Sequence, residues 1–118
     1  MNALPTVDLV ALQRLQRIGG VKLVGEMIDL MLVEGPRRVQ AASAGDQAGS
    51  AREVALAVHS LKSSAGNLGA LALQDLAQQI EVLAAANRLS ECEGLLKRLR
   101  EEMEEVQLRL QEERGKLP

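Results

Sequence analysis

The residue best suited to chemistry in this chain is its single histidine, His59. Lys62 follows at i+3, Ser63 at i+4 and Gly66 at i+7, so on a helix all three lie on neighbouring turns around the imidazole. A neutral imidazole is a competent nucleophile near pH 7. A nearby ammonium disfavours protonation of the ring and attracts phosphoryl oxygens. The spacing therefore indicates a nucleophilic histidine beside an anion-binding cation, with an idle surface histidine as the alternative.

The apolar pattern of the same segment predicts which way the imidazole faces. A stripe of five residues recurs at helical spacing: Val54, Val58, Leu61, Ala65 and Leu68. His59 lies roughly 140° from this stripe, so we expect both His59 and Lys62 to face water. The small residues Ser63 and Gly66 would let a flat partner surface approach closely. Leu56 lies on the exposed side, either as a docking contact or packed under the N-terminal helix.

The elements that must position His59 are helices. Glycine-rich and polar breaks at 19–20, 45–49, 66–69 and 87–90 divide the chain into five helical segments. These are predicted over about 8–18, 21–44, 50–66, 70–86 and 90–114. Apolar residues recur at three- and four-residue steps within them, and in the second segment Leu30 is expected to widen the buried face.

Local signals predict where three of these helices bend or begin. Pro36 should kink the second helix, because its ring displaces the preceding turn and removes one hydrogen bond. Ser50 with Glu53, and Ser90 with Glu93, have capping-box spacing, in which each side chain satisfies the other residue's free backbone N–H. We therefore expect capping boxes at the starts of the third and fifth helices.

Four longer helices with one apolar stripe each predict the architecture. The fold class is all-α, an antiparallel up-down four-helix bundle with a short extra N-terminal helix, and 118 residues fit a single domain over 1–118. A coiled-coil dimer built on the last helix is the competing architecture, but it would leave the other stripes unburied.

Composition limits the classes of function. The chain has no Phe, Tyr or Trp and a net charge of −2, which argues against nucleic-acid binding, because that usually needs a basic excess and stacking aromatics. The lone Cys92 offers no internal disulfide, and no cluster has metal-ligand spacing. No signal peptide or apolar run of about 20 residues is present. We therefore expect a cytoplasmic protein, without a membrane or nucleic-acid partner, that is a monomer.

A family resemblance emerges at the histidine. The stretch 59–70, His-Ser-Leu-Lys-Ser-Ser-Ala-Gly-Asn-Leu-Gly-Ala, closely resembles the signature of histidine-phosphotransfer (HPt) domains, His-x-Leu-Lys-Gly-Ser-Ser/Ala followed by Leu-Gly-Ala. Glu34-Gly35-Pro36 is similar to the family's proline after an acidic residue. Length and helix order also fit. One departure is Ser63, where many members have glycine.

The resemblance implies a phosphorelay intermediate. His59 would be the phosphorylated nucleophile, and Lys62 would stabilise the charge of the phosphoryl group. The chain would be a phosphocarrier without kinase activity and without a cofactor of its own. Mg²⁺ is expected on the partner, which would be the receiver domain of a hybrid histidine kinase or a response regulator. Some members place a Gln beside the histidine; its counterpart by spacing is Glu81, with Gln78 one turn earlier. Leu56, Ser63, Gly66, Gln78 and Glu81 are thus candidate partner-binding residues.

Two other functions are compatible with a histidine on a helical bundle. A sensor-kinase dimerisation domain also carries a histidine on a helical bundle, but such domains typically follow it with an acidic residue, and here Ser60 follows. A non-catalytic helical adaptor would bind a signalling partner without phosphotransfer, with His59 incidental.

Overall fold

The computed structural model describes residues 4–118, and within that range every regular element is helical. The elements in chain order are α1 (Leu9–Gln47), α2 (Ala51–Asn67), α3 (Leu71–Ala85), the 3₁₀ turn η1 (Leu89–Glu91) and α4 (Glu93–Gly115). The predicted domain also includes residues 1–3, which lie outside the described residues.

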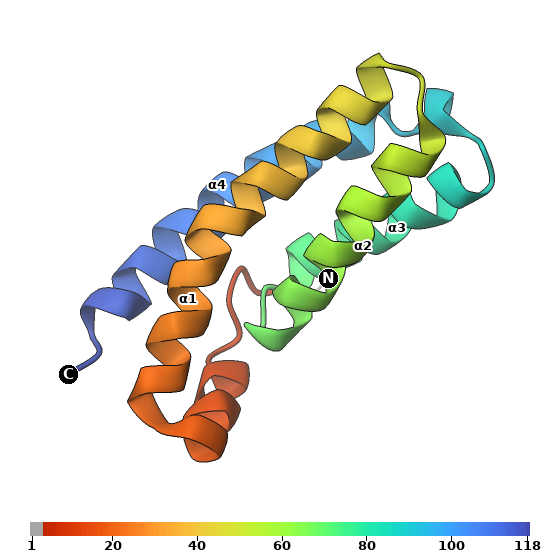
Figure 1. Ribbon diagram of the computed structural model, residues 1–118. Helices are drawn as coiled ribbons and strands as arrows, with labels where there is room; N and C mark the ends of the chain where they lie inside the picture. Colours follow the sequence, from red (N-terminus) through yellow and green to blue (C-terminus); the bar gives the residue numbers. More distant parts are fainter. Residues whose placement is uncertain (1–3) are drawn as a thin grey trace.

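Successive helices run in opposite directions and form an antiparallel bundle (Figure 1). α1 packs against α2 and α4, and α3 packs against the same two helices, so the four axes surround one core. The predicted fold class, an all-α up-down four-helix bundle with a short extra N-terminal helix, is confirmed. One chain buries the stripes of all four helices, which a coiled-coil dimer built on the last helix would leave exposed.

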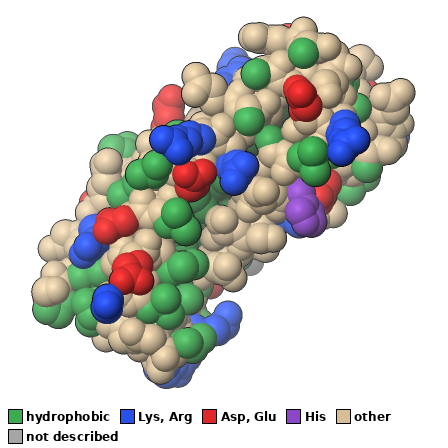
Figure 2. Space-filling view, viewed as in Figure 1, with side chains coloured by type: hydrophobic (Ala, Val, Ile, Leu, Met, Phe, Trp, Pro, Cys, Tyr) green, Lys and Arg blue, Asp and Glu red, His purple; other side chains and the backbone are tan. Residues whose placement is uncertain are grey.

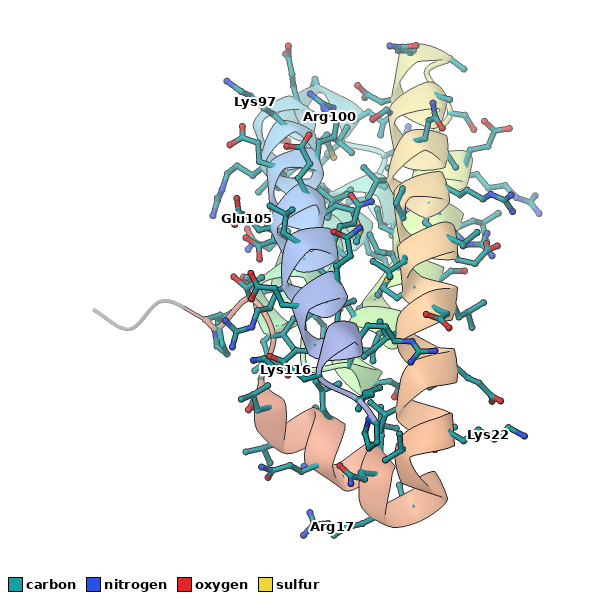
Figure 3. The ribbon with its side chains drawn as sticks, turned by 90° about the vertical axis from the view of Figure 1, so that its left-hand side faces the viewer. Arg17, Lys22, Lys97, Arg100, Glu105 and Lys116 are labelled. Carbon is teal, nitrogen blue, oxygen red and sulfur yellow. The ribbon has the colours of Figure 1, made fainter. Side chains whose placement is uncertain are left out.

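The short N-terminal helix is the first arm of α1. Gly20 separates it from the long arm, with φ 73° and ψ −172°, a backbone region that is essentially open to glycine alone. The chain turns there, so that residues 9–19 cross the base of the bundle while residues 21–47 form its first long helix (Figures 1 and 3). Figure 3 also shows Arg17 of the first arm directed away from the bundle.

Each loop between helices begins with the same kind of helix cap. Gly49, Gly69 and Asn87 follow the last turns of α1, α2 and α3 with positive φ. At the end of α2, the N–H of Ala70 donates to the carbonyl of Ala65 over 2.8 Å, which is the long hydrogen bond of a Schellman motif. Glycine and asparagine tolerate the left-handed conformation, which explains why the predicted breaks at these positions are close to the observed helix ends.

Of the two hydrogen bonds predicted for the capping box of Ser50 and Glu53, only one forms. The backbone N–H of Glu53 donates to the Ser50 hydroxyl over 3.2 Å, while the Ser50 N–H donates to the Gly45 carbonyl instead of to Glu53. The second prediction was wrong. Ser90 lies within η1, and α4 begins at Glu93 after Cys92 with no side-chain cap, because the 3₁₀ turn takes up the residues that were expected to start the helix.

The core is aliphatic, and the predicted stripe of α2 is confirmed. Its five members are at most 1% exposed: Val54, Val58, Leu61, Ala65 and Leu68. One expectation for α1 was wrong: Leu30 is 57% exposed, because Ile28 and Met31 take the buried positions beside it. Pro36 lies inside α1, and the residue of this helix with non-helical torsion angles is Gly20. The kink expected at Pro36 stays a prediction.

We expect Gly69→Ala to lower the free energy of unfolding by about 2–4 kcal/mol. Gly69 has φ +72°, a backbone conformation that is strained for alanine. An added Cβ would also lie 2.6 Å from the Asp8 carbonyl oxygen, which is a backbone atom and cannot rotate away as a side chain could. Gly49→Ala is the matched control, because φ is +70° there and nothing lies within 4 Å of the added atom. Urea unfolding of both variants checks this. Equal losses would mean that the contact with Asp8 contributes nothing.

Candidate functional site

His59 lies on the outer side of α2, two turns before the end of that helix. The side chain is 62% exposed, because the neighbouring positions Val58 and Leu61 take the buried face. Figure 2 shows the imidazole at the surface, with an acidic and a basic side chain beside it. The expectation from periodicity that this ring faces water agrees with its position.

Glu81 of α3 links the histidine to the lysine. Its Oε2 lies 2.5 Å from His59 Nδ1, and its Oε1 lies 2.6 Å from Lys62 Nζ. Gln78, one turn earlier on α3, accepts a second hydrogen bond from Lys62 over 2.9 Å. The antiparallel packing of α2 on α3 therefore brings four predicted site residues into one polar cluster: His59, Lys62, Gln78 and Glu81.

The charge of Glu81 follows from its partners. The hydrogen bond from Lys62 is the largest cause that lowers the pKa of Glu81 below its ordinary value, and the bond to His59 adds to it, while partial burial opposes both. The carboxyl group is therefore ionised at neutral pH. An ionised carboxylate can only accept hydrogen bonds, so the proton of the contact with the imidazole belongs to His59 Nδ1, and in the neutral ring the lone pair is on Nε2.

The expectation that Lys62 is exposed was wrong. Its side chain is only 25% exposed, because it reaches across to α3 and its Nζ is held there by Gln78 and Glu81. A helical wheel gives the direction in which a residue leaves its own helix but says nothing about the neighbouring helix. The ammonium and the imidazole nevertheless meet, through the carboxylate that both contact.

The other predicted partner-binding residues differ in accessibility. Ser63 is exposed beyond His59. Gly66 is half-buried, and the Gln74 amide covers it so closely that an added Cβ would lie 2.4 Å from Nε2. Leu56 is 59% exposed, so the alternative in which the N-terminal helix covers it was wrong. Of the three, Leu56 and Ser63 present the more accessible side chains.

A hollow lined by Ser60 and Ser64 of α2 was not predicted. It has a volume of about 260 Å³ and lies between α1 and α2. Its α2 wall includes Ser60 and Ser64, and its α1 wall includes Leu30, Glu34 and Arg38. The outward position of Leu30 could not be predicted from the spacing of apolar residues in α1. More than one face of this helix is apolar, so the spacing does not show which face is buried.

The described part of the chain lacks two further features. No helix between residues 4 and 118 is long and apolar enough to cross a membrane. In the same range, no three His, Cys, Asp or Glu side chains come together as a metal site would require.

Comparisons with known proteins agree with this geometry. A family model described as the Hpt domain matches residues 26–108, which is more than half of the chain. The crystal structure of histidine-containing phosphotransfer protein B from Pseudomonas aeruginosa PAO1 superposes with a TM-score of 0.90 at 23% identity. That alignment covers 98% of this chain and 100% of the other, and it bears on the fold alone. No curated protein matches this chain.

Proposed function

The chain belongs to the Hpt domain family of histidine phosphotransfer domains in phosphorelays, and from this we propose that His59 takes a phosphoryl group from the aspartate of one receiver domain and passes it to the aspartate of another. The observation that carries the proposal is an exposed imidazole whose Nδ1 is engaged by Glu81 over 2.5 Å, which leaves Nε2 as the reactive nitrogen. The proposal treats residues 1–118 as one such domain, acting as a cytoplasmic monomer.

In the uptake step, the Nε2 lone pair of His59 attacks the phosphorus of the receiver's acyl phosphate. The P–O bond to the aspartate breaks, and its electron pair leaves on the carboxylate. In the discharge step, the P–N bond breaks, its pair returns to Nε2, and the second aspartate takes the phosphoryl group. Mg²⁺ is expected on the receiver domain, where it would neutralise the phosphoryl oxygens.

Lys62 is the cation available to this chemistry. Its Nζ and the His59 ring contact the two oxygens of one carboxylate, so a short movement of the lysine side chain would bring the ammonium to a phosphoryl group on Nε2. Charge that develops on the equatorial oxygens would be stabilised there. We therefore assign the nucleophile to His59 and charge stabilisation to Lys62.

The receiver domain would dock on three exposed apolar side chains, which we call the apolar rim. Leu56 of α2, Leu30 of α1 and Val82 of α3 are each more than half exposed, and Leu56 and Val82 are close in sequence to His59 and Glu81. A protein that brings a carboxylate to Nε2 must cover part of this rim, so these residues would become buried in the complex.

We expect Leu56→Glu to slow transfer from a phosphorylated receiver by about 10-fold or more, because it replaces a central apolar contact with a charge that the acidic receiver site repels. Leu108→Glu is the matched control. Leu108 has nearly the same exposure, 58% against 59%, but lies on α4, which packs on α1 and α3. Equal rates for the two variants would contradict docking at Leu56.

The transfer reaction separates this proposal from the adaptor. The protein is incubated with a receiver domain phosphorylated on its aspartate, and the label that it acquires is tested for stability. A phosphoramidate is labile in acid and stable in alkali, and this is the expected result. Tight binding of the receiver without any label would favour the non-catalytic adaptor, and labelling by ATP alone would favour a kinase domain.

A further inference from the structure

Ser63 lies one turn after His59 on the outer side of α2. Side chains four residues apart on a helix are neighbours, with their Cβ atoms about 5–6 Å apart. Helical side chains also lean towards the N-terminus of their helix, so the Ser63 hydroxyl leans towards the turn that carries His59. Both residues are exposed. The hydroxyl is therefore accessible to a group attached to the imidazole.

The orientation of the ring decides which nitrogen can approach Ser63. Glu81 of α3 holds Nδ1 of His59 over 2.5 Å, so Nε2 points away from that carboxylate. On α2, Lys62 leaves the helix about 60° from His59 towards α3, whereas Ser63 leaves it about 40° to the other side. A phosphoryl group on Nε2 would therefore have Ser63 on the side away from α3.

We propose that the Ser63 hydroxyl donates a hydrogen bond to the phosphoryl group on Nε2 of His59 and thereby stabilises the phosphorylated form of the protein. The inference rests on the proposed function and deepens it, because it assigns a second ligand to the group that is carried. No covalent bond to Ser63 forms or breaks, and the hydroxyl keeps its proton. Ser63 is thus a phosphoryl-binding residue and not a second nucleophile.

Lys62 and Ser63 would bind different oxygens of the phosphoryl group. The three oxygens share its negative charge. Lys62 approaches from the side of α3, where Gln78 and Glu81 hold its Nζ, and it can reach the oxygens on that side. Ser63 can reach an oxygen on the opposite side, which faces solvent. A hydrogen bond to a charged acceptor is stronger than one between neutral groups, so the hydroxyl adds to what the ammonium provides.

The two other serines of α2 are less suited to this role. The Ser64 hydroxyl donates to the Ser60 carbonyl over 3.3 Å, and both residues line the hollow between α1 and α2. Ser60 and Ser64 leave the helix about 100° and 140° from His59, against about 40° for Ser63. Ser63 therefore carries the α2 hydroxyl that is closest in direction to the imidazole.

The proposed hydrogen bond would shift the balance between histidine and aspartate. Ser63 can bind the phosphoryl group on His59 but not the same group on the aspartate of a free receiver domain. It therefore lowers the free energy of phospho-His59 relative to that of the phospho-aspartate. For one exposed hydrogen bond, the equilibrium constant for uptake should be larger by a factor of about 3 to 10.

Phosphorus NMR tests the contact without a receiver domain. The chain has one histidine, so chemical phosphorylation with phosphoramidate gives one phosphohistidine signal to follow. We expect Ser63→Ala to shift this signal, because the donor to the phosphoryl oxygen is lost. Ser63→Thr keeps a hydroxyl and should stay closer to the wild type.

Ser64→Ala is the matched control for these spectra, because it removes a neighbouring hydroxyl that is already bonded to Ser60. It should leave the phosphohistidine signal unchanged. Equal spectra for the wild type and Ser63→Ala would overturn the inference. A label that resists acid and disappears in Ser63→Ala would also overturn it, since the serine would then be phosphorylated itself.

The equilibrium with a phosphorylated receiver measures the size of the effect. Each variant is mixed with the same amount of receiver, and the label on both proteins is measured before the acyl phosphate hydrolyses appreciably. We expect the ratio of His59-bound to receiver-bound label to fall about 3- to 10-fold in Ser63→Ala and to stay the same in Ser64→Ala.

Ser63→Gly separates hydrogen bonding from the space that the serine occupies. It should show the same fall in the ratio as Ser63→Ala, because easier docking changes the rate of transfer but not the position of the equilibrium. A wild-type ratio in both variants would contradict the inference. Failure of the wild-type protein to take label from any receiver would instead contradict the proposed function, while the phosphorus spectrum still decides on Ser63.

Discussion

Replacing His59 by glutamine is expected to abolish the acid-labile label while leaving the bundle folded. Glutamine has no nucleophilic nitrogen, so the loss should be complete to the limit of detection. The fold should survive because the side chain is 62% exposed and belongs to no part of the core; surface changes of this kind usually alter stability by less than about 0.5 kcal/mol. The measurement is uptake of label from a phosphorylated receiver, together with circular dichroism and urea unfolding.

Ser64→Ala provides the control for this variant. Ser64 is exposed on the same helix, and its hydroxyl donates to the Ser60 carbonyl in the preceding turn, so uptake should be unchanged when it is removed. Label that persists in His59→Gln would place the phosphoryl group on another residue. Label lost together with the helical signal would point to unfolding instead of to the chemistry.

Replacing Lys62 by methionine is expected to slow phosphoryl uptake by about 10²–10³-fold, which is the usual cost of removing one group that stabilises charge in a transition state. Methionine is preferred to alanine because Lys62 is only 25% exposed, and an unbranched side chain of similar length fills the same space beside α3. The loss should appear in the rate of transfer and much less in the affinity for the receiver, because the ammonium acts on charge that grows during the reaction.

Two variants control the lysine experiment. Lys62→Arg keeps the positive charge, so it should recover part of the rate; recovery would be incomplete because a planar guanidinium replaces a compact ammonium. Lys22→Met removes a lysine whose side chain is 87% exposed and which pairs with Glu26 over 3.9 Å, and it should have no effect. A Lys62→Met protein that transfers at the wild-type rate would remove Lys62 from the mechanism.

The apolar rim and the polar cluster have different roles in the proposed function: the rim binds the receiver domain, and the cluster assists the transfer. Leu30, Leu56 and Val82 offer exposed apolar surface to a partner, while Glu81 and Lys62 hold charge close to the imidazole. Variants of the rim should therefore change mainly the encounter with the receiver, and variants of the cluster mainly the transfer within the complex. Measuring transfer at several receiver concentrations distinguishes the two.

Features encoded within one helix could be predicted well. The exposure of His59 and the burial of Val58 and Leu61 depend on the angle at which each residue leaves α2, and a period of 3.6 residues is enough to calculate it. The breaks near Gly20, Gly49 and Gly69 depend on positive φ, which glycine adopts without strain. Such features need no knowledge of what packs nearby.

Features that depend on a neighbour were predicted less well. Leu30 belongs to one of several apolar stripes on α1, and only the positions of α2 and α4 decide which stripe is buried. Ser90 has the spacing of a capping residue, but η1 forms there because the chain must turn between α3 and α4. In both cases a local preference was outweighed by the packing of the bundle.

The sequence alone determined an all-helical bundle, the helical segment that carries His59, and the side of that segment which faces water, because each of these follows from spacing along one stretch of chain. The tertiary structure decided that Lys62 turns towards α3 and that Glu81 joins it to the imidazole. These contacts link residues 16 to 22 positions apart. They exist only because α2 and α3 pack antiparallel at a particular register, which the periodicity of either helix cannot specify.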